Sequence, residues 1–107
     1  MLYLRICFDK NGTGDLRDEL RKTHREYVAS HLGGRDGVKV VQGGPMCHGD
    51  DVSNNLGSFL VIEAPSLQHA RRFHDDDPFT RAGLFERADV VRWDRHIGNP
   101  GEGEYTP

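Results

Sequence analysis

The order of the predicted strands and helices is the feature that most constrains this chain. Alternation from Met1 to Asp9 indicates a strand with one apolar face and one mixed face. Apolar residues at three- and four-residue spacing then predict a helix over about residues 16–32. The later elements are expected as strands at Val38–Gln42 and Ser58–Ala64, a helix from Ser66 to before Pro78, and a last strand at about Glu86–Trp93.

Local signals mark where these elements begin and end. Asp15 is the expected N-cap of the first helix, and Gly33-Gly34 is its expected stop. The second strand should end at Gly43-Gly44-Pro45, before a polar loop from Met46 to Gly57. A further helical turn is predicted over Pro78–Ala82.

This order of elements predicts the fold. A chain of 107 residues suits one domain. Two right-handed strand-helix-strand crossovers of the split kind place both helices on one face of a four-stranded antiparallel sheet. We therefore expect an α+β, ferredoxin-like βαββαβ domain over residues 1–93. The Gly/Pro-rich residues 94–107 are expected to form a C-terminal tail.

The strand around Phe59-Leu60-Val61-Ile62 is apolar on both faces. The two helices cover only one side of the predicted sheet. Because a large exposed apolar patch is unusual on a monomer, a second subunit is the simplest cover for the other side. We expect a homodimer packed sheet to sheet.

Composition excludes several classes of function. The 14 basic and 17 acidic residues give a net charge of -3 and are interleaved, so no basic stripe for nucleic acid is present. No apolar stretch approaches the roughly 18 residues of a membrane span, and the N-terminus lacks a signal-peptide pattern. A cytoplasmic protein without a nucleic-acid or membrane partner is expected, in which Cys7 and Cys47 stay reduced.

Two residues suggest chemistry. His24 falls inside the apolar stripe of the first helix, where a buried imidazole needs a polar partner. Asp77 ends an acidic run, Asp75-Asp76-Asp77, at the unfavourable C-terminal pole of the second helix. Asp77 either caps the Pro78 turn or holds His24 in one tautomer, and the two roles do not exclude each other. A His–Asp pair in a pocket supports proton transfer, for which no metal or cofactor is needed.

Arg5 lies on the mixed face of the first strand. It could reach the dimer interior and bind an anionic group of a substrate, or form an interface salt bridge with Asp9 or Glu63. The sequence pattern leaves both roles open.

The chain resembles the YciI-like family over residues 1 to about 93. The residues that carry the resemblance are Met1-Leu2-Tyr3, His24, Gly43-Gly44-Pro45, Asp77-Pro78-Phe79, Ala82-Gly83-Leu84-Phe85 and Trp93. The family belongs to the dimeric α/β-barrel superfamily, and the resemblance implies a His–Asp site, similar to that of muconolactone isomerase-like and dehydrochlorinase proteins. It implies His24 and Asp77 as that pair, although the acidic run leaves open which aspartate faces the pocket.

Two classes of function remain open at this point. The first is a cofactor-free isomerase or lyase that acts on a small carbonyl or carboxylate compound, with His24 as acid/base and Asp77 as its orienting partner. In that case Gly44, Pro45 and Phe79 are expected to contact the substrate together with Arg5. The second is a non-catalytic dimeric module that binds a small molecule or docks on a larger enzyme.

Overall fold

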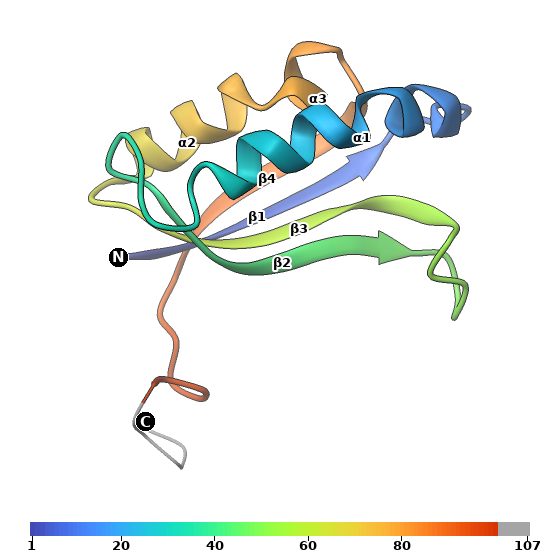
Figure 1. Cartoon of the computed structure of the whole chain (residues 1–107). Helices are drawn as coiled ribbons and strands as arrows, with labels where there is room; N and C mark the ends of the chain where they lie inside the picture. Colours follow the sequence, from blue (N-terminus) through green and yellow to red (C-terminus); the bar gives the residue numbers. More distant parts are fainter. Residues whose placement is uncertain (101–107) are drawn as a thin grey trace.

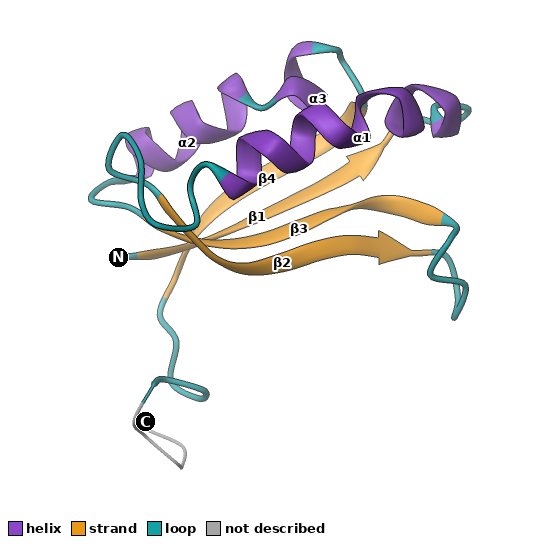
Figure 2. Cartoon of the chain, viewed as in Figure 1, coloured by secondary structure: helices purple, strands orange, loops and turns teal. Residues whose placement is uncertain are grey.

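The fold is a four-stranded antiparallel sheet with its helices on one side, as predicted (Figures 1 and 2). The computed structural model describes residues 1–100. The strands lie in the order β2-β3-β1-β4, so β1 is central and pairs with both β3 and β4. The elements are β1 (Leu2–Asp9), α1 (Gly14–Ala29), β2 (Lys39–Cys47), β3 (Asn55–Glu63), α2 (Leu67–Asp76), α3 (Pro78–Arg81) and β4 (Phe85–Trp93). Residues 94–100 of the predicted tail contain no helix or strand, and residues 101–107 lie outside the described residues.

Helix α1 is shifted towards the N-terminus relative to its predicted range. It begins at Gly14 with Thr13 at the N-cap position, so Asp15 lies in the first turn and the prediction that it caps the helix was wrong. The helix ends at Ala29, and the carbonyl of His31, just beyond it, accepts a hydrogen bond from the Val40 N–H, at 3.0 Å, at the start of β2. The left-handed glycine, Gly34 with φ +92°, therefore lies beyond the end of the helix rather than at its stop.

Strand β2 is longer than predicted, because Gly43-Gly44-Pro45 continues it instead of ending it. Pro45 is tolerated there because β2 is an edge strand, whose outer side needs no hydrogen bonds within the sheet. Gly43 lies opposite Leu60, and a side chain at this position would overlap the carbonyl oxygen of Phe59. The loop between β2 and β3 consequently shortens to residues 48–54.

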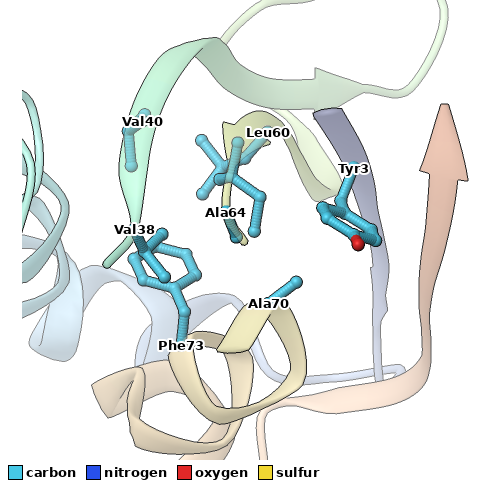
Figure 3. Close-up of a cluster of buried hydrophobic side chains, with 8 residues drawn as sticks. Tyr3, Val38, Val40, Leu60, Ala64, Ala70 and Phe73 are labelled. Carbon is cyan, nitrogen blue, oxygen red and sulfur yellow. The ribbon is translucent and has the colours of Figure 1, made fainter. Parts of the chain in front are cut away.

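The two faces of β1 have different surroundings. Tyr3, Arg5 and Cys7 point towards the helices and are buried, whereas the alternate residues, including Leu4 and Ile6, lie on the open face and are only half-buried. The apolar core thus forms between the sheet and the helices, mainly under α2 (Figure 3). Its labelled members are Tyr3, Val38, Val40, Leu60, Ala64, Ala70 and Phe73.

Within residues 1–100, the helices are all too short or too polar to cross a membrane.

Candidate active site

His24 and Asp77 are hydrogen-bonded to each other, although 53 residues separate them in the sequence. His24 lies on α1, and Asp77 lies at the junction where α2 ends and α3 begins. The distance from His24 Nδ1 to Asp77 Oδ1 is 2.8 Å. Asp77 is extended, with φ -62° and ψ 131°, as expected for a residue before proline, and this break in the helix turns its side chain towards α1.

The Asp77 carboxylate is fully buried and accepts hydrogen bonds on both oxygens. Oδ1 accepts from the Phe79 N–H at 2.9 Å as well as from His24, and Oδ2 accepts from Arg5 Nη1 at 2.6 Å. Burial alone would raise the pKa of Asp77, but the hydrogen bond from His24 and the charge of Arg5 outweigh it and hold that pKa below its ordinary value. Asp77 therefore both caps α3 and holds His24, whereas Asp76 is exposed and pairs with Arg81.

Arg5 lies behind this carboxylate rather than in a substrate-binding position. It is 1% exposed on the helix-covered face of the sheet and forms its salt bridge with Asp77, not with Asp9 or Glu63. Its other nitrogens donate to His74 Nδ1 at 2.8 Å and to Thr80 Oγ1 at 3.3 Å. Burial and the charge of Arg5 lower the pKa of His74, which favours the neutral ring that can accept this bond. Arg5 thus fixes the position of Asp77 from the side away from His24.

A cavity of about 630 Å³ opens beside His24, between α1 and the β2–β3 half of the sheet. Its walls include three of the residues expected to contact a substrate, Gly44, Pro45 and Phe79, and neither Arg5 nor Asp77 borders it. The volume is in the range of typical small-molecule sites, about 300–1,000 Å³. Among residues 1–100, histidine, cysteine and carboxylate side chains form no cluster of three that could hold a metal ion.

The second ring nitrogen of His24 has access to this cavity. The imidazole stacks on Phe79 with ring centroids 4.0 Å apart and planes inclined by 11°, so its orientation is fixed. Nε2 has no hydrogen-bond partner within residues 1–100. Every fully buried side-chain nitrogen or oxygen in that range has a partner, so Nε2 is not fully buried. Since His24 borders the cavity, Nε2 must be open to it.

Two further residues that line the cavity, Arg17 and Ser58, were not expected in the site from the sequence. Both are buried polar residues, at 5% and 4% exposure. In the sequence, Ser58 only marks the start of a predicted strand, and Arg17 is one of many charges on an amphipathic helix. One signal was available: Arg17 precedes His24 by seven residues, which places both on the same side of α1.

We expect the adjacent aspartates Asp77 and Asp76 to differ strongly in their effect on stability. Asp77→Asn leaves Arg5 buried without a counter-charge, which should cost about 3–5 kcal/mol of unfolding free energy at neutral pH. Folding lowers the pKa of Asp77, so its carboxylate stabilises the fold at a pH above its pKa in the unfolded chain. This stabilisation is lost as the pH falls through the pKa of Asp77 in the folded protein. Urea unfolding should therefore show the gap between wild type and variant narrowing below about pH 4.

The matched control is Asp76→Asn, whose ion pair with Arg81 is exposed and should contribute no more than about 1 kcal/mol. Equal destabilisation by the two variants would show that burial of the Asp77 charge does not govern stability.

Comparison with known proteins agrees with the observed fold. A search of curated proteins finds no match. The structure of 5-chloro-2-hydroxyhydroquinone dehydrochlorinase from Burkholderia phenoliruptrix, in complex with 2,5-dihydroxybenzoquinone, is similar with a TM-score of 0.77 and 34% sequence identity. That match covers 88% of this chain and 94% of the dehydrochlorinase.

A second solved structure, of a protein from Agrobacterium tumefaciens, has a TM-score of 0.47 and 19% identity, covers 89% of this chain and 95% of that one, and carries no functional argument. The YCII-related domain matches residues 1–94, which is nearly the whole chain and confirms the resemblance found in the sequence. The chain belongs to the YCII-related family.

Proposed function

We propose that this protein is a cofactor-free enzyme that moves a proton on a small oxygenated ring compound, with His24 as the acid/base. The observation that carries this proposal is the two-sided environment of one imidazole. Nδ1 is bonded to a buried carboxylate, and Nε2 is open to a cavity. A non-catalytic pocket would not need a histidine held in this way.

The hydrogen bond to Asp77 selects the tautomer of His24. An ionised carboxylate can only accept, so Nδ1 carries the proton of the neutral imidazole and Nε2 presents its lone pair to the cavity. When Nε2 takes a proton, the charge of Asp77 stabilises the imidazolium that forms. His24 is in this proposal the catalytic base, and Asp77 is a positioning residue held by Arg5.

Two reactions without a net oxidation use such a base. In an elimination, Nε2 removes a proton from carbon or oxygen, the released electron pair forms a new double bond, and chloride leaves with its own pair. In a tautomerisation, the imidazolium returns the proton to another atom of the same molecule. The 34% identity to a dehydrochlorinase favours elimination from a chlorinated, hydroxylated ring.

Replacement of His24 tests the proposal. His24→Gln keeps a polar side chain but removes the base, so we expect chloride release from 5-chloro-2-hydroxyhydroquinone to fall by about 10²–10⁴-fold. The rate is measured with a chloride electrode under anaerobic conditions, because hydroquinones oxidise in air.

His69→Gln is the matched control for His24→Gln. The His69 ring is hydrogen-bonded to Ser66 at the start of α2 and does not border the cavity, so this variant should keep the wild-type rate. Chloride release by His24→Gln at the wild-type rate would contradict the proposal.

We also propose that two copies pack through their open sheet faces. This face carries half-buried apolar residues on the central strands, together with Phe8 at 37% and Val91 at 43% exposure. No helix of the described chain covers it, as Figure 1 shows. A second copy would remove these side chains from water at about 25 cal/mol per Å² of apolar surface.

The mass in solution tests this assembly. Val91→Glu places a charge on the open face and should convert a dimer into a monomer in sedimentation experiments, whereas Val52→Glu, on the exposed β2–β3 loop, should remain dimeric. A wild-type protein that sediments as a monomer would exclude the sheet-to-sheet dimer.

A further inference from the structure

Arg17 is the most deeply buried residue of α1, and a carboxylate holds it along one edge. Its Nε donates to Asp9 Oδ2 at 2.6 Å and its Nη2 donates to Asp9 Oδ1 at 2.9 Å. This bidentate pair fixes the plane of the guanidinium, because the two donor atoms, Nε and Nη2, lie on the same edge of the group. Asp9 ends β1, so the position of Arg17 is tied to the central strand of the sheet.

The rest of the guanidinium has unused capacity. The second hydrogen of Nη2 is donated to Ser58 Oγ at 2.9 Å, which leaves the Ser58 hydroxyl hydrogen free to donate in turn. Nη1 has no hydrogen-bond partner among residues 1–100. Because every fully buried side-chain nitrogen or oxygen in that range has a partner, Nη1 is accessible. Since Arg17 and Ser58 both border the cavity, Nη1 and the Ser58 hydroxyl are donors available to a molecule inside it.

Phe79 sets the spacing between Arg17 and His24. The imidazole stacks on one face of the Phe79 ring, and the Arg17 guanidinium carbon lies 4.8 Å from the ring centroid. Because the imidazole covers one face, the guanidinium must use the other. Seven residues of helix correspond to a rise of about 10 Å, which is enough to hold the Phe79 ring between the two side chains. A ring compound bound at the edge of Phe79 can therefore reach both His24 and Arg17.

The charge of the cavity wall also favours an anion. Two further arginines of α1, Arg21 and Arg25, border the cavity, and the one carboxylate among its lining residues, Asp18, pairs with Arg21 at 2.6 Å. Arg25 has no charged partner within the described residues. Arginines thus outnumber carboxylates among the lining residues. Asp9 balances the charge of Arg17 from behind the wall, so Arg17 offers a molecule in the cavity a fixed hydrogen-bond donor rather than an unpaired charge.

We infer that Arg17 and Ser58 form an oxyanion-binding subsite, and that the substrate carries an anionic oxygen, as a ring carboxylate or a phenolate, that this subsite recognises. The inference rests on the proposed function, because it orients the substrate relative to the Nε2 atom of His24. In this arrangement Arg17 and Ser58 bind and position the anion, Asp9 positions Arg17, and His24 transfers the proton.

Matched pairs of neutral and anionic probes test the subsite separately from catalysis. Benzoate is compared with benzamide, and para-nitrophenolate with para-nitroaniline, by chemical-shift titration. We expect the wild-type protein to bind at least one anion about tenfold or more tightly than its neutral partner, because charge-assisted hydrogen bonds are the stronger kind. The pair that shows the preference tells whether the subsite takes a carboxylate or a phenolate.

The variants are chosen so that the fold survives. Arg17→Lys keeps the positive charge beside Asp9 but loses the planar fork, and Asp9→Asn with Arg17→Gln removes both charges together, so neither variant leaves a buried charge unpaired. Both should lose the anion preference while keeping the wild-type circular dichroism. Arg72→Gln, which removes an exposed arginine of α2 that does not border the cavity, should keep it.

The outcomes separate the subsite from the proposed function. His24→Gln should keep the anion preference even though it loses chloride release, because it leaves Arg17 and Ser58 intact. A wild-type protein without any anion preference, a preference that survives both Arg17 variants, or a preference that is lost in Arg72→Gln would overturn the inference. Retained anion preference in a wild-type protein that releases no chloride would overturn the proposed reaction and leave the subsite standing.

Discussion

The site depends on one fully buried carboxylate. Asp77 joins three elements, because it accepts from Arg5 on β1, from His24 on α1 and from the backbone of α3. An unpaired charge at this position would be too costly to bury, so the three donors are needed together. The same contacts that satisfy the charge fix the orientation of the His24 ring, which means that stability and the proposed chemistry share one interaction.

The fold supplies this arrangement through two local features. Pro78 prevents α2 from continuing, and the extended Asp77 turns its side chain under α1 instead of into solvent. Arg17 is the one buried residue of α1, and Tyr27 and Val28 near the end of this helix pack against the apolar core, so most of its inner side lies over the cavity. The apolar core sits mainly beneath α2, which leaves the α1 half of the molecule available for a ligand.

Much of the fold and part of the site could be predicted from the sequence. The element order follows from periodicity. The pairing of His24 with Asp77 was implied by the resemblance to the YciI-like family, and the histidine in an apolar stripe and the acidic run at the end of the second helix agreed with it. The role of Arg5 was not predictable, because the sequence does not tell which face of β1 the helices cover. Likewise, the continuation of β2 through Gly43-Gly44-Pro45 depends on long-range pairing with β3. Arg17 was missed since a buried arginine looks like any other helical charge until Asp9 is placed beside it.

The role of Asp77 in orienting His24 is tested most directly by the tautomer of His24, read from the ¹⁵N chemical shifts of histidine-labelled protein. We predict that the neutral ring carries its proton on Nδ1, facing Asp77, with Nε2 unprotonated in the cavity. Disruption of this state by Asp77→Asn would identify the carboxylate as its cause. A wild-type ring protonated on Nε2, with Nδ1 free of its proton, would contradict the role of His24 as a base, because the nitrogen that faces the cavity could not then accept a proton.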